Sequence, residues 1–559
     1  MAIHEVVQNA IRNLPRVLID TISGCLLDKS KQASSFESQP VFMELISSMT
    51  THIDNAHIQQ EVAEYYRYAT FSHTWEKDNE PLFEEVLRIV VYDLDKSFTH
   101  DKLRMFCKLA RDAGFHWAWS DTCCINKSDN VALQEALVAM FKWYEGSALT
   151  IVFLRGVRSP SQRGDLTRSI WNTRAWTFQE YHASKVVRFY TEDWQPYMNL
   201  DIWNHKDSPE VVSEMEEATN VSPGALTALR PGLEDIQEKL CLASRRETLI
   251  VEDAAYSLLG IFSVSLPIVY GEGDRALGRL LAQLLTSSGD TCVLAWTGRS
   301  SSFNSCLPAG ITVFNSFPNA YVPRAITAAE VETTTRTSSP NFTLIMRLYD
   351  RLYELPVPLF AGQRVKLPCL TFKLGAVSAA QNALGQVFRA RTGALGIVTI
   401  RTTEDLSRFD SLTLVHPWID FLLDREPVGI TETIPDNTNN QPFSTRDLPS
   451  SSGPSNTAVW QTRTSRIISR LGRTFSGCGD VDSLLSPSSL SVTEKRAQAL
   501  RFIDRLKQPF GALLLTPTRQ HVEEYRRVAS ESLITVQVEE LTSTVLKKLI
   551  EGARTLDVL

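Results

Sequence analysis

Between residues 68 and 190, short apolar runs alternate with stretches of helical spacing, and this alternation constrains the fold more than any other feature of the chain. Apolar residues in the intervening stretches recur every three or four positions, as on the buried face of a helix. Strands that alternate with helices predict a parallel sheet with helices on both faces. The runs with the length and composition of strands are residues 68–72, 115–119, 149–154 and 185–190.

The pattern of the sequence changes outside this region. Runs such as 307–314 and 342–349 are rich in strand-forming residues and show little helical period. A later stretch is dense in Ser, Thr, Asn and Pro, as linkers are. The predicted parts are an N-terminal helical segment (1–60), an α/β domain (65–195), a helical extension (196–290), a β-rich domain (291–431), a polar linker or disordered loop (432–495) and a C-terminal α/β segment that packs on the β-rich domain (496–559).

Composition narrows the cellular setting. The net charge is −7, and we find no basic stripe with interleaved aromatic residues, so nucleic acid is not an expected partner. Nine cysteines, an odd number without regular spacing, do not form a disulfide framework and favour a reducing compartment. The N-terminus lacks the apolar core of a signal peptide, and no run reaches 18 apolar residues. We therefore expect a cytoplasmic protein without a membrane span.

Candidate functional residues follow the predicted strands. Ligands of open parallel sheets bind outside the carboxyl ends of the strands. This rule selects residues 72–75, residues 121–124 and the segment 174–180. Within the last segment Trp176 and Glu180 are four positions apart and share one face of a helix. A carboxylate beside an indole suits acid–base chemistry or ribose binding, although a surface glutamate over a core tryptophan is the commoner arrangement.

Several segments in this order resemble the motifs of the fungal heterokaryon-incompatibility (HET) domain. They read YATFSHTWE, WAWSDTCCINKS, EALVAMFKWYEGSALTIVFL and RAWTFQE. The following segment, SRRETLIVEDAAYSLLGIFSVSLPIVYGEGDRAL, is similar to the extension found in mushroom-type (basidiomycete) members, so the resemblance covers roughly residues 65–290. One departure is Glu76, which stands where the family usually has glycine after Trp75. Glycine there would permit a positive φ, so the first loop is expected to be reshaped.

The resemblance implies an intracellular effector of vegetative incompatibility and innate-immune-like programmed cell death. HET domains in turn are similar to TIR domains, whose flavodoxin-like fold agrees with the strand order read above. TIR enzymes that cleave NAD carry a Trp-x-x-x-Glu motif, which Trp176 and Glu180 match. Nicotinamide leaves as a neutral group, so one carboxylate would suffice where glycosidases usually need two. NAD is thus a possible substrate, and no cofactor is implied.

The supporting residues each have two interpretations. Asp121 could bind ribose hydroxyls or set the pKa of Glu180, or it could cap a turn. His73 could transfer protons or be satisfied by backbone, and Trp75 could stack on a base or pack in the core. Arg174 could pair with a phosphate or a neighbouring carboxylate. The predicted site has Glu180 as catalytic residue and, as substrate-binding residues, Ser72, His73, Trp75, Asp121, Arg174 and Trp176.

Two further patterns bear on function. Cys107, His116, Cys123 and Cys124 lack the spacing of a zinc site, so no metal is predicted. The charge cluster at residues 245–253 indicates either a solvated face or a domain-docking surface. Two functions besides the enzyme stay open. One is a non-catalytic adaptor that assembles with itself or with an incompatibility partner, and the other is a degenerate member that no longer binds a ligand because of Glu76.

Overall fold

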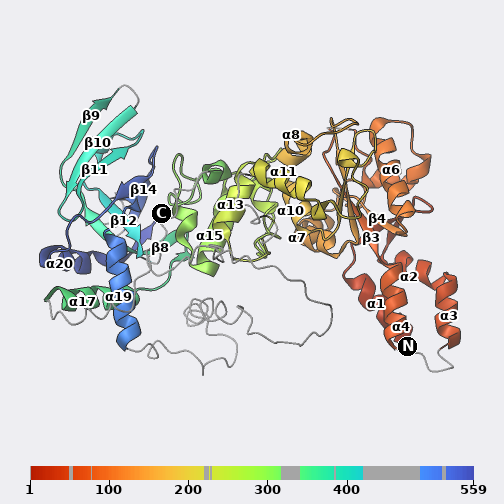
Figure 1. Ribbon diagram of the computed structural model, residues 1–559, viewed down its shortest axis with the longest axis horizontal. Helices are drawn as coiled ribbons and strands as arrows, with labels where there is room; N and C mark the ends of the chain where they lie inside the picture. Colours follow the sequence, from red (N-terminus) through yellow and green to blue (C-terminus); the bar gives the residue numbers. More distant parts are fainter. Residues whose placement is uncertain are drawn as a thin grey trace, which may run out of the picture. The chain divides into compact units, whose positions relative to one another are not determined.

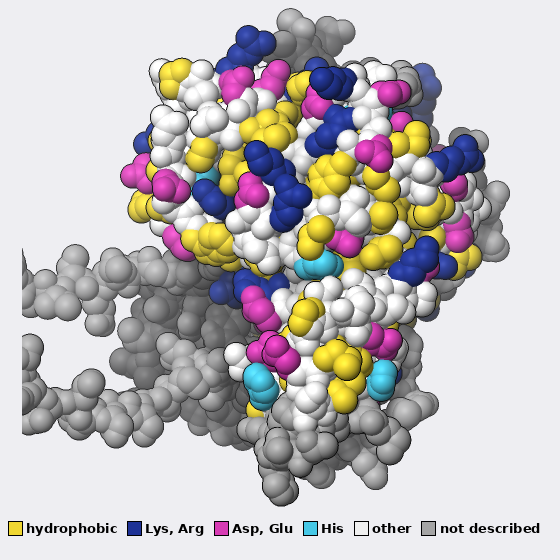
Figure 2. Space-filling model, turned by 90° about the vertical axis from the view of Figure 1, so that its right-hand side faces the viewer, with side chains coloured by type: hydrophobic (Ala, Val, Ile, Leu, Met, Phe, Trp, Pro, Cys, Tyr) yellow, Lys and Arg dark blue, Asp and Glu magenta, His cyan; other side chains and the backbone are white. Residues whose placement is uncertain are grey.

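The structure is a computed structural model, and the chain forms two compact units, Met1–Leu280 and Leu281–Leu559 (Figure 1). No helix in the ranges it describes is long and apolar enough to cross a membrane. On the face drawn in Figure 2, basic and acidic side chains alternate with hydrophobic ones. The described residues are 2–48, 55–76, 79–219, 226, 229–315, 340–382, 385–418, 492–518 and 524–559.

The first unit is built on a six-stranded sheet with the order β2-β1-β4-β3-β5-β6. The last four strands in this order are parallel, as the sequence predicts, and Ala69 of the central strand pairs with both Ala118 and Leu149. The outer pair, β2 and β1, is antiparallel. The strands are β1 (Val17–Asp20), β2 (Leu26–Asp28), β3 (Tyr68–His73), β4 (Trp117–Trp119), β5 (Leu149–Leu154) and β6 (Val187–Thr191).

Three helices connect the parallel strands and cover both faces of the sheet, which confirms the predicted layers. They are α6 (Phe98–Asp112), α7 (Asn130–Gly146) and α10 (Ala175–Ala183). α7 and α10 pack together on one face and α6 lies on the other, as right-handed crossovers require (Figure 1). Side-chain caps begin two of these helices: Ser97 accepts from a backbone N–H of α6, and Asp129 accepts from two in α7.

Residues 1–60 are not purely helical, which corrects the sequence-based interpretation. They contain α1 (Ala2–Arg12), α2 (Lys29–Glu37), α3 (Pro40–Ser48) and α4 (Asn55–Tyr65), together with the β1–β2 hairpin. The hairpin strands are only four and three residues long, too short to show an alternating pattern. Gly24 in the turn has a φ of +73°, and a Cβ there would lie 2.9 Å from the Tyr92 ring, so the turn requires glycine.

The predicted helical extension belongs to the same unit as far as Leu280, and the boundary between the units falls within its last helix. Its longer helices are α11 (Pro209–Thr219), α13 (Ile236–Ser244) and α15 (Arg275–Ser288), with a short α14 (Asp253–Tyr256). A Cβ on Gly260 would lie 2.2 Å from the Phe141 Cβ, so this glycine allows the extension to approach α7 closely. Short elements fill the connections: α5 (Phe83–Arg88), η2 (Val91–Asp93), α8 (Asp165–Arg168), α9 (Ile170–Thr173), η3 (Tyr197–Asn199) and η4 (His205–Asp207).

The second unit is rich in strands, as predicted. Five of them close on themselves, because β12 pairs with β13 and β8, while β16 pairs with β8 and β14. β7 and β15 extend this sheet, and β9, β10 and β11 form a separate antiparallel sheet. The strands are β7 (Leu359–Ala361), β8 (Arg364–Lys373), β9 (Val377–Asn382), β10 (Gly385–Thr392), β11 (Gly396–Arg401), β12 (Thr413–Pro417), β13 (Phe510–Pro517), β14 (Glu524–Val528), β15 (Ile534–Val536) and β16 (Ala553–Val558).

Two strand-rich runs of the second unit prove to be helical or irregular. Residues 342–349 lie in α17 (Pro340–Tyr353), where Leu348, Tyr349 and Leu352 enter the core at helical spacing. Residues 307–314 form a bend and the 3-10 helix η6 (Ile311–Asn315). In residues 342–349 the β-forming residue types hid a helical spacing that the sequence contains. The remaining helical elements are η5 (Thr291–Leu294), η7 (Leu406–Arg408), α19 (Val492–Leu506) and α20 (Ser543–Gly552).

The C-terminal segment is part of the β-rich fold. Its strands β13, β14 and β16 complete the closed sheet with β8 and β12, so residues 496–559 share a sheet with residues 291–431. Most of the predicted linker, residues 432–491, lies outside the described residues. Residues 492–495 already belong to α19.

Candidate functional site

The predicted site residues come from the carboxyl ends of β3 and β4 and from α10. β3 and β5 are neighbours in the sheet, and the connection after β3 runs to β4 on one side while the connection after β5 runs to β6 on the other. This is the switch point at which open α/β sheets bind ligands. Ser72 and His73 end β3, and Asp121 follows β4 directly. Sequence spacing and strand order therefore direct these side chains to one edge of the sheet.

Glu180 lies at the centre of a buried hydrogen-bonded cluster. Its side chain is on α10, and the residue is only 5% exposed. The Ser72 hydroxyl donates to Glu180 Oε2 at 2.5 Å, and Trp171 Nε1 donates to Ser72 Oγ at 2.8 Å. Ser184 donates to the backbone carbonyl of Glu180 at 2.6 Å and holds the end of the helix. The indole linked to Glu180 is therefore that of Trp171, and the Ser72 hydroxyl connects the two side chains.

The surroundings of Glu180 favour its neutral form. Burial raises the pKa of this carboxyl, the nearby negative charge of Asp121 raises it further, and the result is a pKa of about 8. Hydrogen bonding to Ser72 and Tyr144 and the charge of Arg246 act in the opposite direction. The Tyr144 hydroxyl also donates to the Phe71 carbonyl at 2.8 Å. At neutral pH the site therefore holds a protonated acid that can ionise within one or two pH units.

Trp75 and Asp121 form a second, more exposed part of the site. Trp75 Nε1 donates to Asp121 Oδ2 at 2.9 Å, and Trp75 is 43% exposed, so the core-packing interpretation is wrong. Lys127 Nζ lies 3.5 Å from the centroid of the Trp75 ring, a cation–π contact. Asp121 accepts the indole N–H and also acts on Glu180 by charge, as one of its predicted roles requires. The two parts of the site are thus electrostatically linked.

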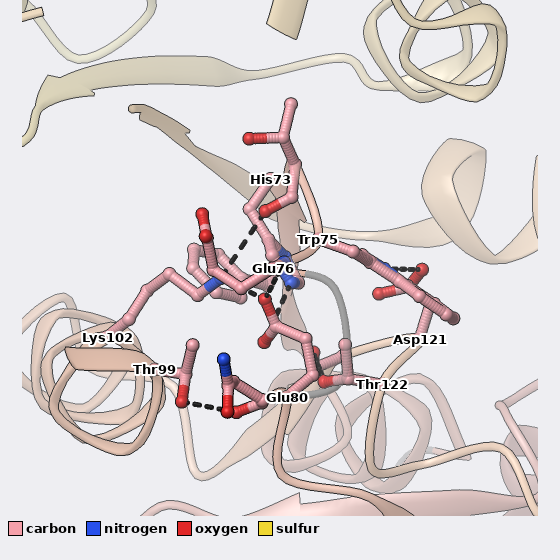
Figure 3. Close-up of polar contacts among 12 residues, drawn as sticks. His73, Trp75, Glu76, Glu80, Thr99, Lys102, Asp121 and Thr122 are labelled. Atoms are coloured by element: carbon pink, nitrogen blue, oxygen red, sulfur yellow. Dashed lines mark hydrogen bonds and ion pairs between the residues drawn. The ribbon is translucent and has the colours of Figure 1, made fainter. Parts of the chain in front are cut away.

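His73 belongs to a buried charged cluster that sequence reasoning missed (Figure 3). Glu80 Oε1 lies 2.5 Å from Lys102 Nζ, and Glu80 Oε2 lies 3.7 Å from His73 Nε2, too far for a hydrogen bond. No backbone group satisfies the imidazole, because neither ring nitrogen has a hydrogen-bond partner among the described residues. Burial and the Lys102 charge lower the pKa of His73, so the ring is neutral. A signal existed: Lys102 lies on the apolar face of α6, next to Leu103.

Glu76, the residue in place of the family glycine, is accommodated by polar partners. Its side chain forms an ion pair with Arg155, and its backbone N–H donates to Glu80 Oε1 at 2.8 Å. Lys102 Nζ also contacts the Thr74 carbonyl at 3.4 Å. The loop after β3 is therefore organised around the Glu80 carboxylate, whose neighbours Figure 3 draws together.

Trp176 and Arg174 do not join the Glu180 cluster. The Trp176 side chain and the Arg174 charge act instead on the Asp253 carboxyl, whose pKa they lower against the effect of burial. The backbone of Arg174 forms a parallel bridge with Glu247. Both interpretations of Arg174 stay open, and among the described residues the Trp-x-x-x-Glu spacing brings no hydrogen bond between Trp176 and the Ser72 network.

Arg246, which sequence reasoning assigned to a charged surface cluster, is in fact buried beside α10. It is 6% exposed, and its Nη1 donates to the Arg174 carbonyl at 3.1 Å and to Thr177 Oγ1 at 3.0 Å. The guanidinium lies 5.1 Å from the Phe178 ring centroid. Nothing in the sequence around Arg246 distinguishes it from an exposed arginine, so its burial could not be predicted.

The described residues contain no group of three or more His, Cys, Asp or Glu side chains arranged to hold a metal ion. Cys107, Cys123 and Cys124 are buried and unpaired. Burial raises the pKa of the Cys107 and Cys124 thiols well above the usual value. These thiols therefore stay protonated and are poor nucleophiles.

Comparison with known proteins identifies part of this unit. Residues 68–166 match the family described as Heterokaryon incompatibility protein (HET), which confirms the resemblance for that region. The chain is 32% identical over 234 residues to the Vegetative incompatibility protein HET-E-1 of Podospora anserina, a region that covers 40% of this chain and 16% of that protein. No solved structure matches the chain. The family match includes Ser72, His73, Trp75 and Asp121 and ends before Glu180.

Proposed function

We propose that this protein is a cytoplasmic effector of heterokaryon incompatibility whose first unit releases nicotinamide from NAD. The HET match and the similarity to a vegetative incompatibility protein support the biological role. A TIR-like, flavodoxin-like assignment is supported by the order of the parallel strands. β3, the first of them in the chain, lies between β4 and β5, the second and the third. Unpaired cysteines in the described ranges agree with a reducing compartment.

One observation carries the enzymatic proposal. Glu180 is a buried acid with a pKa of about 8, hydrogen-bonded by Ser72 at the edge where such sheets bind ligands. Carboxyl groups with strongly perturbed pKa values are concentrated at functional sites. Asp121 and the exposed Trp75 lie within the electrostatic and hydrogen-bonding reach of the same cluster.

The chemistry needs only one carboxylate. The bond between C1′ of the ribose and the pyridinium nitrogen breaks, and nicotinamide leaves as a neutral molecule with the bonding electron pair. The ionised Glu180 stabilises the oxocarbenium-like ribose, and a water molecule adds to C1′ and loses a proton, which yields ADP-ribose. Because the carboxylate is the active form, we expect the rate to rise with pH towards the pKa near 8. The positive charge of bound NAD favours ionisation at lower pH.

Nicotinamide release by the full chain tests this proposal, with Glu180→Gln as the diagnostic variant. Glu214→Gln is a matched control, because Glu214 is also buried and accepts a hydroxyl hydrogen bond, from Tyr197 at 2.9 Å. We expect Glu180→Gln to abolish release and Glu214→Gln to retain it. Release by both variants at the wild-type rate would refute the role of Glu180.

A non-catalytic adaptor is the second candidate, and the burial of Glu180 favours it. A side chain that is 5% exposed and hydrogen-bonded internally also suits a structural role. On this alternative the chain triggers growth arrest in fungal cells through assembly with partners, and Glu180→Gln leaves the arrest intact. Loss of arrest in Glu180→Gln but not in Glu214→Gln favours the enzyme.

A further inference from the structure

Arg245 and Arg246 are adjacent in the chain but have opposite environments. Arg245 is exposed, whereas Arg246 is buried at the start of α10. Burying a guanidinium is costly unless its donors are satisfied and its charge has a partner. The donors of Arg246 are satisfied by neutral groups, the Arg174 carbonyl, Thr177 Oγ1 and Asn172 Oδ1, the last at 3.4 Å. None of these neutral groups compensates the positive charge of Arg246.

The Glu180 carboxyl is the acidic group whose charge acts on Arg246. The two side chains act on each other through space: the Arg246 charge favours the ionised form of Glu180, and Glu180 favours the charged form of Arg246. Both lie along α10, since Arg246 binds the first turn at Thr177 and Glu180 follows three residues later. Arg246 is thus the cation placed to compensate an ionised Glu180.

The segment that carries Arg246 is fastened to the helix by its backbone. Glu247 N donates to the Thr173 carbonyl at 2.6 Å, and Ala175 N donates to the Glu247 carbonyl at 3.0 Å. These bonds fix both sides of the turn that starts α10. Through them the helical extension, which follows the sheet in the sequence, contacts the helix that bears the acid.

We propose that Arg246 is a positioning residue that fixes the start of α10 and enables Glu180 to ionise, so that the helical extension controls the protonation state of the site. This inference rests on the proposed function for its consequence in activity. Its electrostatic part concerns the protein alone and can be tested without a substrate.

The charged and titratable groups that face Glu180 come from three neighbouring segments. Asp121 follows β4 and disfavours ionisation, the Tyr144 hydroxyl on α7 favours it, and Arg246 from the extension supplies the positive charge. Ser72 on β3 contributes a neutral hydroxyl. Removal of Arg246 leaves Asp121 as the dominant charge, and Glu180 then remains protonated to higher pH.

Thermal unfolding measures this effect in a double-mutant design. Glu180→Gln removes the cost of ionising a buried acid, so its gain in Tm over the parent grows with pH and levels off once Glu180 has ionised in the folded parent. We expect levelling near pH 8 in the wild-type background and at a higher pH in Arg246→Gln. Arg245→Gln, which removes the same charge from the exposed neighbour, should level off at the wild-type pH.

The same variants separate positioning from simple packing. Arg246→Lys keeps the charge and loses part of the hydrogen bonding, so its Tm should fall while the levelling pH stays near that of the wild type. An unchanged levelling pH in Arg246→Gln would overturn the proposal, and so would an equal upward shift in Arg246→Lys. If Arg246→Gln does not fold, the Arg246→Lys result decides.

The pH profile of nicotinamide release provides the second readout. Its rising limb should move up by the same interval in Arg246→Gln and stay in place in Arg245→Gln. A shift in the unfolding experiment without nicotinamide release from any variant would refute the proposed function and leave the role of Arg246 standing.

Discussion

Glu80 and Glu180 are two buried glutamates at the same edge of one sheet, yet their surroundings drive them to opposite protonation states. Burial acts to raise the pKa of Glu80, but the Lys102 ammonium at 2.5 Å from the carboxylate acts against it, and the pKa is lowered. Glu180 has hydroxyl neighbours instead, with Asp121 near by, and its pKa rises to about 8. Because the Lys102 ammonium compensates its charge, the Glu80 carboxylate stays ionised and serves to hold the loop together. Glu180 retains a proton that it can exchange.

The difference distinguishes a structural carboxylate from a candidate functional one. Active sites often hold pairs of titratable groups whose environments separate their pKa values, and such a separation assigns acid and base roles. Glu80 organises the loop that carries Trp75, through Lys102 and the N–H of Glu76. The pKa of Glu180 is about 8, so this carboxyl can gain or lose its proton near neutral pH. Four substitutions break or sharpen this contrast.

The largest effect is expected from Glu80→Gln. This change leaves the Lys102 ammonium buried without its carboxylate, which should lower the free energy of unfolding by about 3–5 kcal/mol at pH 7. Because the pKa of Glu80 is lowered in the fold, its stabilisation is present above the unfolded pKa and is lost as pH falls through the folded one. Urea unfolding at pH 7 and pH 4 checks this. A loss that is equal at both pH values would contradict the ion-pair account.

Glu180→Gln should have the opposite sign. The folded pKa of Glu180 lies above its unfolded value, so ionisation costs the wild type stability as pH rises from about 4.5 to about 8. At pH 8 we expect the variant to be about 4 kcal/mol more stable than the wild type, since each pKa unit corresponds to about 1.4 kcal/mol and Glu180 is half ionised at this pH. At pH 4.5 the two proteins should differ by less than about 1 kcal/mol. A variant that is less stable at pH 8 would contradict the raised pKa.

His73→Gln should have a smaller effect. The imidazole lies 3.7 Å from Glu80 and stacks on Phe71 with the ring centroids 4.3 Å apart. Replacement should cost about 1–2 kcal/mol, mostly from lost packing of a buried ring. The pH at which the Glu180→Gln gain levels off should not move, because His73 belongs to the Glu80 cluster. Thermal melts of the double variant provide the measurement, and a shift would show that the two clusters are coupled.

Trp75→Phe should affect stability least. It removes the indole N–H that binds Asp121 but keeps an aromatic ring under Lys127. We expect a loss of about 0.5–1 kcal/mol, because the residue is 43% exposed and water replaces the lost donor. Under the proposed function the KM for NAD should rise while the pH dependence of stability is retained. An unchanged KM would exclude Trp75 from the binding surface.

The sheet and part of the site could be predicted because local patterns specify them. Runs such as 149–154 are continuous and apolar, and their bounds agree with β5. Ser72 lies at the end of a strand and Asp121 just beyond the end of the next, and the strand order brings both close to Glu180. The hairpin β1–β2 was missed because its strands are too short to show a period.

The charged clusters could not be predicted because they depend on contacts between distant segments. Glu80 meets Lys102 across 22 positions, and Arg246 reaches Thr177 across 69. The sequence spacing also selected the wrong tryptophan. Trp176 has the spacing of the motif, but Trp171 donates to Ser72 beside Glu180. Burial of a charge is a property of the fold, and neighbouring arginines such as Arg245 and Arg246 look alike in the sequence.

Infrared difference spectra at pH 6 test most directly whether Glu180 is the protonated member of the pair. A protonated buried carboxyl has a carbonyl stretch that ionised carboxylates lack. We predict that the wild-type protein shows this band, that Glu180→Gln lacks it and that Glu80→Gln retains it. A band that persists in Glu180→Gln, or one that Glu80→Gln removes, would contradict the assignment of the two carboxyl groups.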